Sequence, residues 1–243
     1  GPVYLVGARE VMEEEVEPVE LDLDRWKPIA PLALHEGAAK QIVDALAGAK
    51  RPLVVTSFIG RNPAAVQPLI DLCETLGVGV LESVPNAMNY PHDNALYLGN
   101  QWNQPFQNPH LADADVVLVI DSDVPWIPTV SKPSETAKIF HIDVDPLKES
   151  IPLWYIKANA SYQADAATAL AQLNAYAKTL GEVAGAAERK AHYSTAHEAR
   201  AAALAAAEVK PEGTITSEYL VACVRKAVGA DAIVLNEGIT NDP

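Results

Sequence analysis

The stretch Ile-Phe-His-Ile-Asp-Val-Asp-Pro, residues 139–146, is a short apolar run that ends in two carboxylates and a proline. Its apolar residues follow one another with little alternation, which is the pattern of a strand buried on both faces. The aspartates and the proline mark a turn, because these residue types favour the end of a strand. We therefore expect a buried strand over residues 138–144.

Before this strand, the sequence repeats the pattern of a helix followed by a buried strand. Strands that alternate with helices and are apolar on both faces indicate a parallel sheet. The sequence thus predicts an α/β fold, with a Rossmann-like open parallel sheet and helices on both faces. In chain order the expected elements are helix 36–49, strand 52–56, helix 63–76, strand 78–81, helix 108–112 and strand 116–121.

The residues after this strand are rich in alanine, which favours helices. We expect a helix over residues 164–175 and a helical arm that continues to about residue 208. Thr216 is a candidate N-cap for a further helix over residues 217–227. An apolar run at residues 232–235 predicts one more buried strand.

The candidate ligand site lies after the strands, because open parallel sheets bind ligands at the carboxyl ends of their strands. Arg61 follows the first strand and is either a phosphate ligand or a surface side chain. Asp143 and Asp145 follow the strand at 138–144, and their carboxylates suit either ribose hydroxyls or the capping of the next turn. His141 lies inside that strand, so we expect a hydrogen-bonded core histidine rather than a catalytic base.

Charge and composition exclude several classes of protein. The formal net charge of -14 argues against a nucleic-acid surface, which needs clustered cations. The acids of residues 1–24 are expected to form a solvated face. No apolar stretch reaches the roughly 18 residues that span a bilayer, and we expect a cytoplasmic protein. Cys73 and Cys223 lie far apart among apolar neighbours, so both are expected to be buried and unpaired.

Three stretches together resemble the central domain of thiamine diphosphate-dependent enzymes of the acetolactate synthase type. They are Arg-Pro-Leu-Val-Val at 51–55, Ala-Asp-Val-Val-Leu-Val-Ile at 114–120, and the stretch at 139–146, which is the most specific. Residues 1–5 resemble the closing strand of the family's pyrimidine-binding domain, and residues 234–241 resemble the opening of its diphosphate-binding domain. The resemblance implies that the chain is the middle of a longer enzyme.

This resemblance also implies that the chain divides into four parts. Residues 1–35 would be the end of the pyrimidine-binding domain and a linker, and residues 36–180 a central Rossmann-like domain of the DHS-like NAD/FAD-binding type. Residues 181–212 would be a helical linker, and residues 213–243 the start of the diphosphate-binding domain.

The catalytic parts of such enzymes are missing from this sequence. The Gly-Asp-Gly stretch that holds magnesium and the diphosphate in the family does not occur, so we expect no catalytic residue and no metal ligand here. Glu237, Gly238 and Ile239 match the edge of the diphosphate site, although they depart from the Gly-Gln of acetolactate synthases. Thiamine diphosphate and magnesium are therefore expected in the parent enzyme, and no cofactor in the isolated chain.

Members of the family bind FAD or ADP in the central crevice or leave it empty. A pyrophosphate needs close approach to the backbone, which glycines allow, and free N–H groups. Here the first loop carries bulky Phe58 and Ile59 before Gly60, and Asp121 and Asp123 add negative charge after the third predicted strand. FAD is therefore not expected. An empty crevice is favoured over ADP, and both stay open.

The resemblance implies a 2-oxo acid decarboxylase or carboligase, hence a lyase or transferase, in which this chain is a central structural domain. The isolated chain is expected to be inert. Its expected partners are the missing catalytic domains of the same chain and further copies in a homo-oligomer. Aromatic residues in loops agree with interfaces to such partners: Trp102, Phe106, Trp126, Trp154 and Tyr155.

Two alternatives remain. The first is a free-standing module that binds a nucleotide, ADP or FAD, or has a regulatory role. The second is a magnesium-dependent phosphotransfer enzyme built on the carboxylates of Asp121, Asp123, Asp143 and Asp145, since clustered carboxylates bind magnesium. We expect no lysine or arginine near these acids to bind a phosphoryl group, and this counts against the second alternative.

Overall fold

The computed structural model describes residues 3–102, 104–152, 155–229 and 231–235. The chain divides into two units, Gly1–Ala30 and Pro31–Pro243. Within the described ranges, every buried residue belongs to the second unit. No helix in these ranges is long and apolar enough to cross a membrane.

The first unit has little regular structure. Its described part forms α1 (Arg9–Met12) and the short 3-10 helix η1 (Leu23–Arg25). Residues 3–6 are 82–91% exposed and form no strand. The resemblance implies a strand here in the complete enzyme, and residues 3–6 do not form one in this chain. A strand needs a neighbour for its backbone hydrogen bonds, and no other described segment pairs with these residues.

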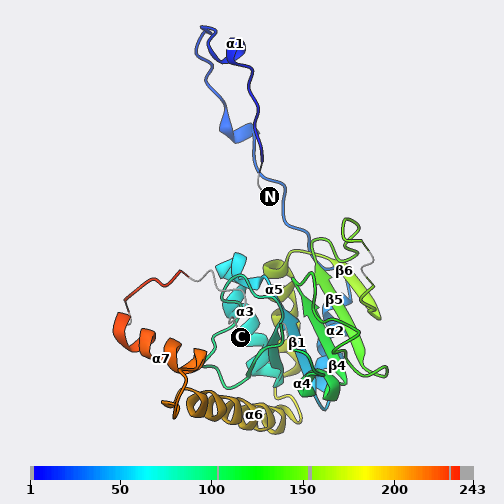
Figure 1. Ribbon diagram of the computed structural model, residues 1–243. Helices are drawn as coiled ribbons and strands as arrows, with labels where there is room; N and C mark the ends of the chain where they lie inside the picture. The colour runs from blue at the N-terminus through cyan, green and yellow to red at the C-terminus, as the bar shows by residue number, and fades with distance from the viewer. Residues whose placement is uncertain (1–2, 103, 153–154, 230, 236–243) are drawn as a thin grey trace. The chain divides into compact units, whose positions relative to one another are not determined.

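The second unit is built on a six-stranded parallel sheet (Figure 1). The spatial order is β3-β2-β1-β4-β5-β6, and all five neighbouring pairs are parallel. This is the order of Rossmann-like folds, so the predicted fold class is confirmed. The strands are β1 (Pro52–Thr56), β2 (Gly79–Glu82), β3 (Tyr97–Asn100), β4 (Val116–Ile120), β5 (Lys138–Asp143) and β6 (Ala160–Gln163).

Both faces of the central strands are covered. Helix α5 (Ala166–Ala177) packs against α2 (Ala38–Gly48) and α3 (Pro63–Leu76). The chain passes through α3 from β1 to β2, and in the opposite direction through α4 (Pro109–Asp113) from β3 to β4. Because parallel crossovers are right-handed, α3 and α4 lie on opposite faces of the sheet. As a result every residue of β1 and β4 is buried.

The sequence predicts neither β3 nor β6, which are the two edge strands of the sheet. β3 reads Tyr-Leu-Gly-Asn and β6 reads Ala-Ser-Tyr-Gln, so neither has a long apolar run. An edge strand is short and pairs on one side only, so it needs less apolar surface than a central strand. The four strands that the sequence predicts form the centre of the sheet.

Helix α6 (Ala186–Ala207) packs against the sheet through its first half. Buried Arg189 donates from Nε and Nη2 to the carbonyl of Leu76, at 3.0 and 2.6 Å. The Tyr193 hydroxyl donates to the carbonyl of Pro52 at 2.7 Å. Further along, α6 contacts β3 and so covers part of this edge of the sheet, which limits pairing with other chains. A 3-10 turn, η3 (Lys178–Leu180), connects α5 to the segment before α6.

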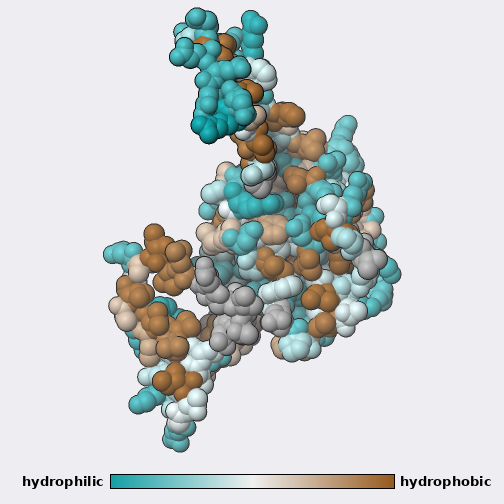
Figure 2. All heavy atoms as spheres, turned by 45° about the horizontal axis from the view of Figure 1, so that its top comes forward, coloured by the Kyte–Doolittle hydropathy of each residue, from teal (hydrophilic) through white to brown (hydrophobic). Residues whose placement is uncertain are grey.

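Helix α7 (Ser217–Val228) begins where the sequence predicts, with Thr216 Oγ1 accepting a hydrogen bond from the amide of Tyr219. Only one of its described residues, Ala222, is buried. Apolar side chains at helical spacing are exposed along it, and Figure 2 shows the resulting hydrophobic surface. These side chains are Leu220, Val221, Val224 and Val228.

Two predictions for this end of the chain are wrong. Cys223 is exposed because it lies on α7, which packs little of its surface, whereas Cys73 is buried as predicted. Residues 231–235 form no strand, and Ile233 is 92% exposed. As at residues 3–6, no described segment offers a neighbouring strand.

Candidate functional site

The candidate ligand crevice lies where β1 and β4 are neighbours, because the direction of the chain's crossovers reverses between these strands. Its walls are the loops at their carboxyl ends. After β1 come residues 57–58 and the 3-10 turn η2 (Ile59–Arg61), and after β4 come residues 121–123.

Backbone hydrogen bonds connect these two loops directly. The amides of Ser57 and Phe58 both donate to the carbonyl of Asp121, each at 3.0 Å. In nucleotide-binding folds the amides of this first loop face the pyrophosphate. Here two of them are bonded to the protein itself, so they are not available to a ligand.

Three buried serines close the crevice further. Ser57 Oγ donates to the carbonyl of Ser83 and lies 2.7 Å from Ser122 Oγ. Ser83 Oγ donates to the carbonyl of Val124 at 2.6 Å. The serines therefore link the ends of β1, β2 and β4 to one another.

Gly60 is the glycine of the first loop, and it faces protein rather than an open site. Its amide donates to Asn89 Oδ1 at 3.0 Å, and a Cβ at this position would overlap the carbonyl of Met88. The absence of a side chain at Gly60 thus allows the loop to contact residues 87–89. The fit to a bound pyrophosphate is poor.

Asn89 is held in turn by Glu82, the buried last residue of β2. Glu82 Oε1 accepts from Asn89 Nδ2 at 2.8 Å, and Oε2 accepts from the Tyr97 hydroxyl at 2.7 Å and lies 3.2 Å from His92 Nε2. Although burial raises it, these hydrogen bonds hold the pKa of Glu82 below its ordinary value. The carboxylate therefore fixes the connection between β2 and β3 against the first loop.

Lys148 supplies the positive charge at the acidic side of the crevice. Its Nζ lies 2.7 Å from Asp123 Oδ1 and 2.8 Å from Asp143 Oδ2. Burial lowers the pKa of Lys148, but the hydrogen bonds with the two carboxylates raise it by more. The pKa is therefore above its ordinary value, and the ammonium is charged. The expectation that these acids have no lysine partner is therefore wrong.

The missed signal for Lys148 is its position as the first cation after β5, on the carboxyl side of the sheet. Its φ of 50° is unusual for a residue other than glycine, and Asp121 has a φ of 48°. Such a conformation persists only where the surrounding structure fixes it. The local sequence gives no indication of this conformation.

Asp121 and His141 are buried titratable groups beside this ion pair. Burial, and next the charge of Asp143, raise the pKa of Asp121 to about 6. Burial lowers the pKa of His141 to about 4. His141 is 1% exposed, as expected of a core histidine, and its Nε2 lies 4.0 Å from Asp143 Oδ2. A neutral imidazole follows at neutral pH.

The structure places the other predicted site residues as follows. The guanidinium of exposed Arg61 lies over the ring of Phe58, 4.6 Å from its centroid. Asp143 Oδ1 accepts from the amide of Asp145 at 2.9 Å, and Asp145 Oδ1 accepts from the amide of Lys148 at 3.2 Å. Both carboxylates thus cap the turn after β5. Glu237, Gly238 and Ile239 lie outside the described residues, as does Trp154.

The described residues do not form a metal site. No group of three or more histidine, cysteine, aspartate or glutamate side chains in this part of the chain is arranged to hold an ion. The carboxylates of Asp123 and Asp143 are directed at Lys148, so they do not suit magnesium. A phosphotransfer site on these acids is therefore not supported.

Comparison with known proteins agrees with the observed fold. Residues 39–173 match the family described as thiamine pyrophosphate enzyme, central domain, and this range contains all six strands. No curated protein matches the chain.

Two solved structures are similar. A "putative thiamin diphosphate-dependent enzyme" from Mycobacterium smegmatis is 24% identical, with a TM-score of 0.48, over 61% of this chain and 29% of that one. Benzoylformate decarboxylase from Polynucleobacter necessarius is 20% identical, with a TM-score of 0.50, over 67% of this chain and 30% of that one. The matched region is thus less than a third of either relative, and the second match supports the fold.

Proposed function

The chain belongs to the family of thiamine pyrophosphate enzyme central domains, and we propose that it is the central structural domain of an enzyme that acts on 2-oxo acids by decarboxylation or carboligation. In this proposal the domain sets the spacing of the parent's catalytic domains and contributes to subunit packing. By itself the chain is inert. The decarboxylase among the similar structures agrees with this class of substrate, since benzoylformate is a 2-oxo acid.

The closed crevice is the observation that supports a structural role for the domain over a ligand-binding role. Amides that would face a pyrophosphate are bonded to Asp121, and the hydroxyl of Ser57 is bonded to Ser83 and Ser122. A nucleotide would have to break these buried hydrogen bonds, each of which is costly to leave unmade. We therefore propose that no flavin binds here.

Thiamine diphosphate and magnesium belong to the parent in this proposal. The described residues do not fit either group, because they offer no cluster of metal ligands and the sequence has no Gly-Asp-Gly stretch. Glu237, Gly238 and Ile239 would contact the edge of the diphosphate only in the complete enzyme.

The proposed partners are the missing catalytic domains of the same chain and further copies in a homo-oligomer. Exposed apolar residues at 3–6, on α7 and at 233–235 support such contacts, because contiguous apolar surface commonly marks an interface. The net charge of -14 supports the absence of a nucleic-acid partner. A cytoplasmic location completes the proposal.

Calorimetric titration of the chain with thiamine diphosphate and magnesium tests its inertness. We expect no saturable binding at micromolar concentrations, and no turnover of pyruvate or benzoylformate. Binding or turnover would contradict the proposal. The intact mass of the native protein from its source cells tests the parent separately, and a much longer chain is expected.

One observation favours the alternative of a nucleotide-binding module. Thr56 Oγ1 and Asp121 Oδ1 are buried at the ends of β1 and β4, and neither has a hydrogen-bond partner among the described residues. Such acceptors suit a ribose hydroxyl. Titration with ADP decides between the two functions, since saturable binding that Asp121→Asn weakens would support the module.

A further inference from the structure

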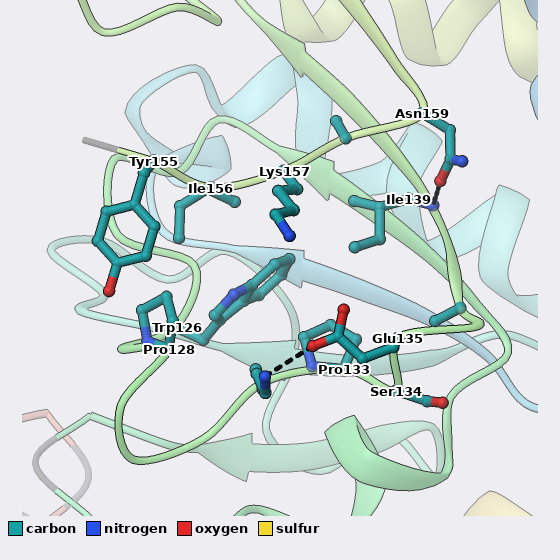
Figure 3. A pocket seen from close by; sticks show the side chains of 13 residues that line it. Trp126, Pro128, Pro133, Ser134, Glu135, Ile139, Tyr155, Ile156, Lys157 and Asn159 are labelled. Atoms are coloured by element: carbon teal, nitrogen blue, oxygen red, sulfur yellow. Dashed lines mark hydrogen bonds and ion pairs between the residues drawn. The ribbon is translucent and has the colours of Figure 1, made fainter. Parts of the chain in front are cut away.

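A cavity of about 360 Å³ lies at the amino ends of β5 and β6, whereas the crevice lies at the carboxyl ends of the strands (Figure 3). It is formed by the connection from Trp126 to Ala137 and by residues 155–159, which lead into β6. Cavities of this size are typical of small-molecule sites. Trp126 and Tyr155, both expected at interfaces, belong to its lining.

Aromatic and aliphatic side chains form its walls. Trp126 is 5% exposed and lies in the middle of the view in Figure 3, below Ile156 and Lys157. Ile139 lies on one side of it, and Tyr155 with Pro128 on the other. An indole in the lining offers a stacking surface for a flat ring.

The charged residues of the lining are two lysines and one glutamate. Lys132 Nζ lies 2.7 Å from Glu135 Oε1, and the charge of Lys157 also acts on this glutamate. Hydrogen bonding to Lys132, followed by the charges of Lys132 and Lys157, holds the pKa of Glu135 below its ordinary value. With one carboxylate for two ammonium groups, the lining has a net positive charge in a chain whose formal charge is -14.

We propose that this cavity binds a small aromatic carboxylate, with its ring against Trp126 and its carboxylate at Lys157. A cavity of about 360 Å³ has room for a flat ring of one or two fused cycles. The excess ammonium charge favours an anion over a neutral ligand of the same shape. This assignment does not depend on the proposed function, because the cavity shares no residue with the crevice.

Isothermal titration of the full chain with 2-naphthoate tests the proposal, with 2-naphthamide as the neutral ligand of the same shape. We expect saturable binding of the carboxylate in the micromolar to millimolar range, and binding of the amide at least about threefold weaker. Lys157→Glu should weaken the carboxylate about tenfold and leave the amide nearly unchanged. Lys178→Glu, at an exposed lysine of η3, makes the same charge change outside the cavity and should have little effect.

Ile156→Trp is the steric test, because a larger side chain should fill the cavity and abolish binding of both ligands. Thermal unfolding of each variant shows whether it remains folded. The proposal is overturned if the carboxylate does not bind below about 10 mM, or if the carboxylate and the amide bind equally. It is also overturned if folded Lys157→Glu and Ile156→Trp variants bind like the unsubstituted chain.

Discussion

The Nζ of Lys148 lies 2.8 Å from Oδ2 of Asp143, and the two side chains are only 6% and 3% exposed. Asp143 ends β5 and Lys148 belongs to the connection that follows, so the pair fixes this turn against the sheet. Asp123, after β4, accepts a second contact from the same ammonium. In a phosphate site this charge would face a ligand. Here two protein carboxylates already neutralise it.

Lys148→Met should destabilise the protein strongly. The substitution leaves the nearly buried carboxylate of Asp143 without its cation, and breaking a buried ion pair costs about 3–5 kcal/mol. Since Asp123 is partly exposed, the lower end of this range is expected. Urea denaturation at pH 7 measures the loss, with Lys178→Met as the exposed control. Equal stability of the two variants would contradict the structural role of the pair.

Asp121→Asn should stabilise the protein above pH 6. The folded-state pKa of about 6 exceeds the ordinary value of 3.8, so the folded protein binds more protons than the unfolded chain between these values. The contribution of Asp121 to stability therefore falls as pH rises from about 4 to 6, and the asparagine variant removes this loss. Asparagine also tolerates the positive φ at this position.

The expected gain for Asp121→Asn is about 1–3 kcal/mol at pH 8, because one pKa unit corresponds to about 1.4 kcal/mol. The gain should vanish near pH 4. Urea denaturation across this pH range measures the difference in the free energy of unfolding between the variant and the unsubstituted protein. A difference that does not change with pH would show that Asp121 is not a buried acid with a raised pKa.

The centre of the sheet could be predicted from the sequence because each of β1, β2, β4 and β5 lies in a local apolar run. Local patterns of this kind encode which segments are buried on both faces. The edge strands could not be predicted, since β3 and β6 exist through pairing with a neighbour rather than through apolar composition. The position of α6 over β3 could not be predicted either, because it also depends on contacts between distant segments.

The state of the crevice was only partly predictable. Bulky Phe58 and the acids after β4 indicate a poor fit to a pyrophosphate, and the sequence shows both. The hydrogen bonds that close the crevice join residues far apart in the chain, such as Ser57 with Ser122 and Lys148 with Asp123. Such pairs depend on the packed loops, and no local pattern reports them.

Gly60→Ala should destabilise the protein because the new Cβ would overlap the carbonyl of Met88. Overpacking of this kind costs about 1–3 kcal/mol. Gly48→Ala is the matched control, since a Cβ at this helical position meets nothing within 4 Å. Alanine is the better helix former, and a gain of up to about 1 kcal/mol is expected there. Urea denaturation separates the two variants, and equal effects would contradict the close contact at Gly60.

Amide hydrogen exchange should divide the chain into a protected sheet and exposed ends. Residues 3–6 and 233–235 are apolar and exposed, and they form no strand with any described segment. Burying a few such side chains is worth several kcal/mol at about 25 cal/mol per Å², which favours association when a partner is present. We therefore expect fast exchange at both ends in dilute solution and slow exchange in β1 and β4. A dilution series followed by mass spectrometry shows whether protection of the ends rises with concentration, as association between copies requires. Slow exchange at both ends at every concentration would mean that these residues are packed within the single chain, and their proposed role in contacts with other domains would then fail.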